Sequence, residues 1–536
     1  MKNSIIKYLL LIPVLALIFT SCVQDLDVEP IDPDEQTANN VFETAEDYLQ
    51  ALAKIYASYA VSGQQGSGGG DPDIEGIDEN FGNYLRQLWG LQELPTDEAI
   101  MAWDDATIKN FHWHTWAPND VFISALYSRI FYSIAVANEF IRNARDAEIS
   151  NGALDVMIAE ARFLRAFSYW HAIDMFGNVP FVTEDDLPGA FLPEQIQRTD
   201  LFEYVEGELL EIESQLGEPG WEYARADQAS AWMVLAKLYL NAEVYTGTER
   251  YSDALTYVNK VIDAGYSLDP VYENVFRADN HLSPEIIFPI AFDGTNTQQY
   301  GGMTFLLHAS NGGGMPLNGI DGGWGGIRTI RDFVEGIFDV QETDFSTASP
   351  EYSPPDSRGM FYFNPEDWEW EVTNVGTFTH GIGITKFKNI TADGGPAPNV
   401  HPTFVSTDFP VFRLADAYLM YAEIVLRGGG GDRGTALDYV NMLRQRAYGD
   451  DSGNISDAEL TLSFIIDERA RELHWENHRR TDLIRFGMFT GDEYIWEWKG
   501  NVKEGTGTES YRDLYPIPSN DLNANPNLVQ NDGYTN

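Results

Sequence analysis

Cysteine is almost absent from this chain of 536 residues, which contains a single copy at position 22. One cysteine excludes an intramolecular disulfide framework, a thiolate zinc cluster and a Cys-x-x-Cys redox pair. Positive charge is also scarce, because 34 lysine and arginine residues stand against 83 aspartate and glutamate residues, for a formal net charge of −49. Such an acidic surface repels phosphate backbones, so we set nucleic-acid binding aside.

The familiar catalytic motifs are missing as well. The sequence contains no G-x-S-x-G elbow, Walker loop, dinucleotide-binding glycine fingerprint or H-E-x-x-H motif. His474 and His478 have i, i+4 spacing, but arginines surround them, and we interpret this stretch as a packed, ion-paired helix. Residues 71–76 begin like a calcium loop, yet Gly82 at the twelfth position supplies no bidentate carboxylate. The sequence therefore predicts no catalytic residue and no metal ligand.

The composition nevertheless predicts a folded protein. Hydrophobic residues make up 43% of the chain and charged residues 22%, which is too apolar for a disordered chain. The length suits about three or four domains, or one large unit.

The first residues have the pattern of a bacterial lipoprotein signal. Lys2 and Lys7 precede an apolar run at 8–19, and small residues stand directly before Cys22. The run is too short to span a bilayer core of about 30 Å, and no other run is long enough. We predict a signal peptide over 1–21, lipidation of Cys22 and an acidic, proline-containing tether over 22–40. The alternative is an ordinary secretory signal with an incidental cysteine.

An internal repeat indicates the fold class. Residues 236–243 and 254–259 have counterparts at 415–423 and 436–441, and each copy reads as two helices joined by a turn. Small alanines between large aromatic residues allow close helix packing, as in tetratricopeptide-like pairs. Further helical periodicity is found in segments 43–60, 120–145, 161–174, 201–216 and 459–477. We predict a mainly α protein, an α/α superhelix of tetratricopeptide-like helix pairs.

The character of the sequence changes between residues 271 and 408. Glycine clusters at 312–314 and 322–326 break any long helix, and 378–387 has the pattern of a short strand. We therefore predict an N-terminal helical region over 41–270, a loop-rich ligand-binding insertion over 271–408 and a C-terminal helical region over 409–536, because binding groups commonly lie on loops held by rigid elements.

Aromatic side chains occur in loops where a core helix would not place them. Trp103, Tyr300 and Trp324 are the main examples, with Trp113 and Trp116 as further candidates. Flat rings beside polar groups suit carbohydrate, because the C–H face of a pyranose packs on the ring while polar groups bond its hydroxyls. The alternative is that these aromatics fill gaps under the loops.

Several stretches along nearly the whole chain carry a family resemblance. They are ELPTDE at 93–98, ARFLRA at 161–166, FGNVP at 176–180, FPVFRLAD at 409–416, RRTDLIRFG at 479–487, YPIP at 515–518 and QNDGY at 530–534. With these stretches the chain resembles the SusD/RagB family of outer-membrane lipoproteins, which capture nutrients, mostly glycans, for a SusC-like TonB-dependent transporter. Within that family it is most similar to the starch-binding founder, through 63–64, 71–73, 93–98 and 300–302.

The resemblance implies a fold, a place and a site. The implied fold has four tetratricopeptide-like helix pairs and an irregular ligand-binding subdomain. The implied protein is a non-catalytic lipoprotein exposed at the cell surface. It holds an oligosaccharide, here a starch-like α-glucan, and delivers it to the transporter. The implied ligand site comprises Arg86 as a hydroxyl-bonding cation, Tyr300 and Trp324 as stacking platforms, and Met101 at the position of a third platform, with Trp103 two residues on. At the nearby position where the family resemblance implies an asparagine, this chain has Ala106. The stretch at 279–281 corresponds to the calcium-binding segment of the founder but is shorter, so we predict no cofactor, a structural calcium being the alternative.

Other functions stay open at the level of sequence. A member of the same family that binds peptides or another nutrient would share these features. A surface glycosidase would need a carboxylate pair in the same cleft. A helical scaffold that binds only protein would need no exposed aromatic side chains.

Overall fold

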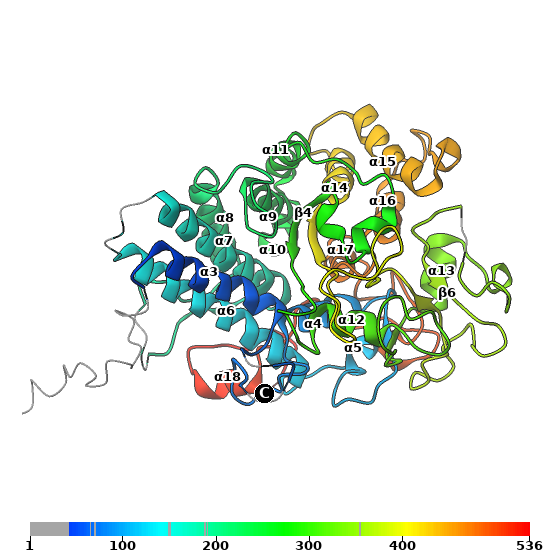
Figure 1. Cartoon of the computed structure of the whole chain (residues 1–536), viewed down its shortest axis with the longest axis horizontal. Coiled ribbons are helices and arrows are strands. Elements are labelled where there is room, and N and C mark those ends of the chain that lie inside the picture. Colours follow the sequence, from blue (N-terminus) through cyan, green and yellow to red (C-terminus); the bar gives the residue numbers. More distant parts are fainter. Residues whose placement is uncertain are drawn as a thin grey trace, which may run out of the picture.

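The computed structural model of the chain describes residues 42–535, except 65, 69–70, 148, 150–151, 187–188, 190 and 353–354. The predicted signal peptide, Cys22 and the tether lie outside the described residues. The molecule is mostly helical, with its N-terminal helices on one side and the loop-rich part around α13 and β6 on the other (Figure 1). The predicted mainly α class is confirmed.

The N-terminal half consists of long helices that pack side by side. They are α3 (Ala45–Ala60), α4 (Tyr84–Glu93), α6 (Val121–Arg145), α7 (Gly152–Met175) and α8 (Arg198–Ile212), with the short α5 (Asn110–Trp113) after α4. Thr44 and Asp120 cap α3 and α6 by accepting backbone N–H groups. By length and hydropathy α6 would suit a membrane span, but 61% of its apolar window is buried against its neighbours. It is a core helix here.

Both copies of the internal repeat form helix pairs. The first is α9 (Gln228–Leu240) with α11 (Tyr251–Ile262), separated by the short α10 (Ala242–Thr246), and the second is α14 (Leu414–Leu426) with α15 (Arg433–Tyr448). In the second pair the rings of Tyr418 and Tyr439 stack with centroids 4.3 Å apart. Because α11 also packs on α14, the two pairs join into one layer (Figure 1).

The loop-rich part contains short, paired strands and small helices. β4 (Ile286–Ile290) pairs antiparallel with β8 (Phe409–Arg413) and thereby closes the insertion at its base. The other antiparallel pairs are β1 (Ile100–Met101) with β5 (Ile327–Arg328), β2 (Val179–Pro180) with β3 (Gln195–Ile196), and β6 (Phe361–Tyr362) with β7 (Gly383–Ile384). The helices here are α12 (Gly302–Ala309) and α13 (Arg331–Phe338), and the 3₁₀ turns are η1 (Tyr272–Phe276), η2 (Asn280–Leu282) and η3 (Glu342–Asp344). The strand predicted over 378–387 is therefore limited to the two residues of β7.

The C-terminal region differs from its prediction at one point. The helix expected over 459–477 ends earlier, as α16 (Leu462–Leu473), and α17 (Arg479–Arg485) starts after a loop. In that loop Trp475 and Asn477 have φ of 64° and 66°, values that helices do not contain. His474 and His478 therefore do not share a helix face. The remaining elements are η4 (Asp451–Gly453), η5 (Lys499–Asn501), η6 (Ser510–Asp513) and α18 (Ser519–Ala524).

Buried carboxylates from a distant segment explain the break. The Trp475 N–H donates to Glu98 at 2.9 Å and the Asn477 N–H to Glu93 at 2.6 Å. The indole N–H of Trp475 also reaches the backbone carbonyl oxygen of Glu98, at 3.0 Å. These contacts satisfy backbone donors that a continued helix would have used otherwise, and they attach the C-terminal region to the turn between α4 and β1.

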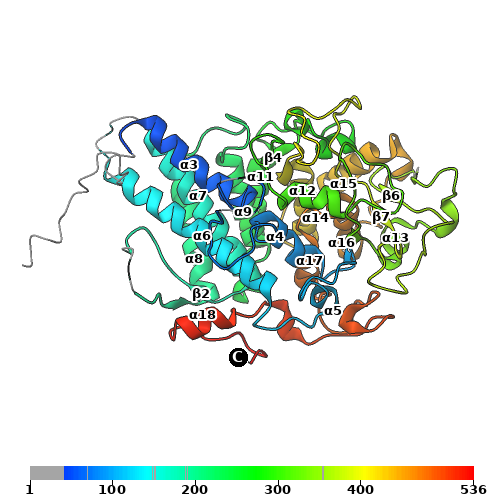
Figure 2. The same cartoon turned by 60° about the horizontal axis from the view of Figure 1, so that its bottom comes forward.

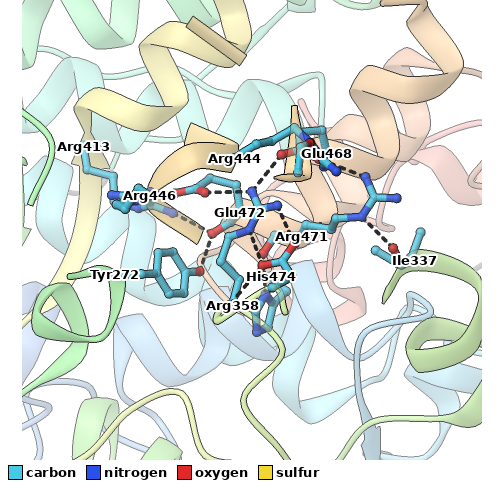
Figure 3. Close-up of polar contacts among 12 residues, drawn as sticks. Tyr272, Ile337, Arg358, Arg413, Arg444, Arg446, Glu468, Arg471, Glu472 and His474 are labelled. Atoms are coloured by element: carbon cyan, nitrogen blue, oxygen red, sulfur yellow. Dashed lines mark hydrogen bonds and ion pairs between the residues drawn. The ribbon is translucent and has the colours of Figure 1, made fainter. Parts of the chain in front are cut away.

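A buried cluster of charges joins the insertion to the C-terminal helices (Figure 3). Glu472 of α16 accepts hydrogen bonds from Arg413 of β8 at 2.6 Å, from Arg358 of the insertion at 3.1 Å and from Arg446 of α15. The three arginines hold the pKa of Glu472 far below its usual range, although burial alone would raise it. The loop-rich part is thus held rigidly on the helical frame.

Candidate functional site

Three of the predicted aromatic side chains lie in one continuous row. The ring centroids of Trp103 and Trp324 are 6.5 Å apart with an interplanar angle of 38°, and those of Trp324 and Tyr300 are 6.2 Å apart at 49°. All three residues are half-buried, so each keeps some solvent contact. We call these three side chains the aromatic platform. Their planes turn in succession, so the platform is not flat.

The pairing of β1 with β5 brings two of these rings together. Trp103 lies two residues after β1, and Trp324 lies three residues before β5. The indole N–H of Trp103 donates to the backbone carbonyl oxygen of Trp324 at 3.2 Å. A Cβ atom at Gly326 would stand 2.7 Å from the Trp103 ring, so the close approach of these segments needs glycine at that position.

Trp324 rests on a buried histidine of α12. The His308 and Trp324 rings stack with centroids 4.5 Å apart and an angle of 22° between their planes. The backbone N–H of Trp324 also donates to the backbone carbonyl oxygen of His308 at 2.7 Å. Tyr300 stands just before α12, and its ring contacts that of Phe404 with centroids 5.3 Å apart. Both Trp324 and Tyr300 are therefore fixed in orientation by rings behind them.

Arg86 of α4 joins the same group. Its guanidinium lies 4.1 Å from the ring centroid of Phe305, and that ring contacts Trp103 with centroids 5.9 Å apart. Nη1 of Arg86 donates to the carbonyl oxygen of Asn80 at 2.9 Å. Burial lowers the pKa of Arg86 to about 10, against which the nearby carboxylates of Asp78 and Asp105 act, so the side chain stays cationic at neutral pH. Figure 2 shows α4 and α12 next to each other.

Met101 is placed differently from the other predicted site residues. Its side chain is fully buried in β1. Met101 lies close to Gly326, the glycine beside Trp103, because a Cβ atom added at Gly326 would be 3.1 Å from the Met101 sulfur atom. Met101 therefore supports the platform from within the core, and its contact with a ligand stays a prediction. Ala106, at the position of the expected asparagine, is exposed and has φ of 40°.

Two other tryptophans that were expected in loops have ring contacts outside the platform, and Trp113 is the last residue of α5. Trp116 is buried and donates its indole N–H to the hydroxyl of Tyr534 at 2.6 Å. The indole nitrogen of Trp113 is buried as well and bonds to none of the described residues. For Trp116 the gap-filling alternative is the correct one, whereas Trp113 is half-buried and its role stays a prediction.

Sequence reasoning missed the supporting residues. Phe305, His308 and Phe404 carry the contacts behind the platform, yet no motif marks them. Phe305 and His308 belong to an apolar eight-residue helix, which looks like an ordinary core segment. A possible signal was the closeness of Tyr300 to the start of that helix.

The acidic stretches considered for calcium have protein partners. Asp73 forms ion pairs with Lys54 at 2.6 Å and Arg129 at 3.2 Å, and Asp279 accepts the Ala392 N–H at 2.9 Å. Among the described residues, no cluster of three or more His, Cys, Asp or Glu side chains is arranged to hold a metal ion. The alternative of a structural calcium stays untested.

Comparisons with known proteins now decide the family. The SusD family model matches residues 284–534. The starch-binding protein SusD of Bacteroides thetaiotaomicron is 36% identical, and the similarity covers 100% of both chains. The chain belongs to the SusD family. The SusD-like protein P25 of Formosa agariphila is a more distant relative, 26% identical over 77% of this chain and 79% of its own length.

Solved structures show the same fold. A SusD homolog from Bacteroides thetaiotaomicron has a TM-score of 0.70 at 18% identity, covering 93% of this chain and 98% of its own. Surface glycan-binding protein A from the same organism, solved in complex with laminarihexaose, has a TM-score of 0.66 at 20% identity and covers 91% and 100%. The SusD-family architecture expected from the sequence is therefore confirmed.

Proposed function

We propose that this SusD-family protein captures a neutral oligosaccharide, a starch-like α-glucan, on the aromatic platform and releases it unchanged. The observation that carries the proposal is the row of three half-buried rings, two of which pack on the rings of His308 and Phe404. Pyranose rings stack on such surfaces through their C–H faces, and this contact does not depend on the net charge of the protein. The starch-binding relative at 36% identity supports the same ligand class.

The shape of the platform favours a curved chain. Successive ring planes turn by 38° and 49°, so three sugar units that each lie on a ring cannot be coplanar. An α-linked glucan curves along its length, whereas an extended ribbon would leave one ring uncovered. Arg86, a cation at the end of the row, donates hydrogen bonds to sugar hydroxyls in this proposal.

Binding without cleavage is part of the proposal. Glycoside hydrolysis needs two carboxyl groups that flank the scissile bond. Glu93 and Glu98, which precede Trp103 in the sequence, are almost fully buried and engaged by the 475–478 loop. Asp104, next to Trp103, forms an ion pair with Lys109. Product release from starch during a long incubation would contradict this part.

Isothermal titration with maltoheptaose tests the site. We expect Trp324→Ala to weaken the affinity about tenfold or more, because a central aromatic anchor is removed. Trp221→Ala is the matched control, since Trp221 is a tryptophan that is 40% exposed but lies in the α8–α9 connection, outside the platform. Equal affinities of the wild type and Trp324→Ala would remove the site assignment. A panel with other glucans and a peptide digest identifies a different cargo.

We further propose that acyl chains on Cys22 anchor the protein at the cell surface, where it passes its ligand to a SusC-like TonB-dependent transporter in the outer membrane. The lipoprotein pattern before Cys22 supports the anchor, and family membership supports the partner. In the native cell, Cys22→Ser should release the protein from the membrane fraction. The tagged wild type should co-purify with a TonB-dependent barrel, and recovery without one would contradict the partnership.

A further inference from the structure

The hydrogen bonds of His308, the residue under Trp324, define its protonation state. Nδ1 lies 2.6 Å from the carbonyl oxygen of Gly322, and Nε2 lies 2.8 Å from the carbonyl oxygen of Thr403. A carbonyl oxygen can only accept a hydrogen bond, and a neutral imidazole carries one N–H. His308 is fully buried, and if its ring were neutral, the nitrogen without a proton would face a carbonyl oxygen with lone pair against lone pair. Both contacts are hydrogen bonds only when the ring is an imidazolium.

Another buried histidine shows the contrast. Nε2 of His114 lies 2.7 Å from the carbonyl oxygen of Pro95, but Nδ1 lies 3.0 Å from the hydroxyl of Thr508. That hydroxyl can donate to Nδ1, so a neutral ring satisfies both contacts. Burial accordingly lowers the pKa of His114 to about 3. His308 lacks such an adjustable partner.

A carboxylate is placed to support a charged His308. Oδ1 of Asp321 lies 3.9 Å from Nδ1 of His308, and its other oxygen accepts the hydroxyl of Thr403 at 2.7 Å. One compact contact thus links α12, the Asp321–Trp324 segment and the loop that carries Phe404 behind Tyr300. With Trp324 stacked on the imidazolium, this contact sets the positions of two of the three platform rings.

We propose that His308 is a positioning residue that makes glycan capture depend on protons: as an imidazolium it fixes the Trp324 and Thr403 segments under the ligand, and loss of its proton loosens them. The proposal rests on the proposed function of the platform. The sign of the effect follows from the two carbonyl contacts. The charged ring donates from both nitrogens and the neutral ring from one, so capture should be stronger with the protonated ring and weaker with the neutral one.

The other charged groups around this contact act differently. Nδ1 of His401 accepts the N–H groups of Thr403 and Phe404, both at 3.1 Å, so these contacts need an unprotonated nitrogen, the opposite of what His308 needs. Arg86, on the neighbouring α4, has a pKa of about 10 and does not change charge below pH 9. A neutral oligosaccharide has no group that titrates in this range. A loss of affinity on the alkaline side is therefore assigned to His308.

The test combines binding and spectroscopy. We measure the affinity for maltoheptaose by isothermal titration at about pH 6 and about pH 8.5, which bracket the usual range of histidine. The wild type should bind about tenfold more weakly at the higher pH, because one charge-assisted hydrogen bond is lost. His308→Gln, neutral at every pH, should bind with the weaker affinity at both. Asp321→Asn should move the loss of affinity to lower pH, and His114→Gln should keep the wild-type profile.

Nitrogen NMR of histidine-labelled protein decides the protonation state without any ligand. The signal that disappears in His308→Gln should show two protonated ring nitrogens at about pH 6. A neutral ring at that pH, or a wild-type affinity equal at both pH values, would overturn the proposal. If no sugar binds at any pH, the proposed function is wrong, but the NMR experiment still decides whether His308 is protonated. If His308→Gln does not fold, Asp321→Asn still tests the shift.

Discussion

Trp103 donates its indole N–H to the backbone carbonyl oxygen of Trp324, 3.2 Å away, and so joins two rings that are 221 residues apart in sequence. The bond holds one platform ring at a fixed place relative to the next. Because the two segments are also joined by β1 and β5, the spacing of the rings belongs to the scaffold and does not depend on a ligand. Such preorganisation lowers the entropic cost of binding.

Substitutions at Trp103 separate the two roles of its side chain. Trp103→Phe keeps a flat ring but removes the N–H donor, and we expect it to weaken maltoheptaose binding about threefold to tenfold, as expected for one lost hydrogen bond. Trp103→Ala removes the ring as well and should weaken binding further. Titration calorimetry measures both. Equal losses in the two variants would show that stacking on this ring contributes nothing.

Met101 should affect stability more than affinity. Because its side chain is fully buried beside Gly326, Met101→Ala leaves a cavity under the platform. The expected loss in the free energy of unfolding is about 2–5 kcal/mol, whereas Met101→Leu, of similar volume, should cost less than about 1.5 kcal/mol. Thermal unfolding followed by calorimetry measures the difference. An alanine variant with unchanged stability but lost affinity would instead make Met101 a ligand contact.

The buried carboxyl pair predicts a stability effect of pH. Burial raises the pKa of Glu93 to about 7 from an ordinary 4.5, and it also raises the pKa of Glu98, which lies beside it. The folded protein therefore binds more protons than the unfolded chain between about pH 4.5 and 7, so this pair lowers stability as the pH rises through that window.

Glu93→Gln tests this effect. The amide oxygen of glutamine can still accept the Asn477 N–H, and the amide N–H₂ can donate to Glu98. We expect the variant to be more stable than the wild type at pH 8, by about 1 kcal/mol or more, and to have a flatter stability profile between pH 5 and 7. Thermal melts across this range measure it. A variant that is equally destabilised at every pH would contradict the assigned protonation.

The charge cluster around Glu472 should be intolerant of a missing partner. Glu472→Ala leaves Arg358, Arg413 and Arg446 without their shared carboxylate in a buried place. Removal of one member of a buried ion pair typically costs about 3–5 kcal/mol. Glu211→Ala is the matched control, because Glu211 also pairs with an arginine but is 69% exposed, and its loss should cost about 0.5 kcal/mol or less. Similar melting temperatures for both variants would contradict the role of the cluster.

The sequence allowed the helix pairs and the platform rings to be predicted, but not their supports. The repeats at 236–259 and 415–441 were visible because the alternation of small and large residues is local and sets helix packing directly. Trp103, Tyr300 and Trp324 were recognisable as rings in loops. Whether such a side chain is buried depends on contacts between distant segments. The burial of Trp116 and Met101 could therefore not be predicted from the sequence around them.

The loop after α16 shows the same limit. Local periodicity favours a helix through 477, and only the carboxylates of Glu93 and Glu98, nearly 400 positions earlier, end it at Leu473. His308 is a further case, since its two acceptors, Gly322 and Thr403, come from separate loops. Long-range polar contacts of this kind leave no periodic pattern in a sequence.

The most direct test of the aromatic platform is a crystal structure of the protein with maltoheptaose. We expect sugar rings to lie against Trp324 and Tyr300 at van der Waals distance, about 4 Å, with Arg86 in hydrogen-bond reach of a hydroxyl. A sugar bound at another surface, with these rings uncovered, would contradict the account.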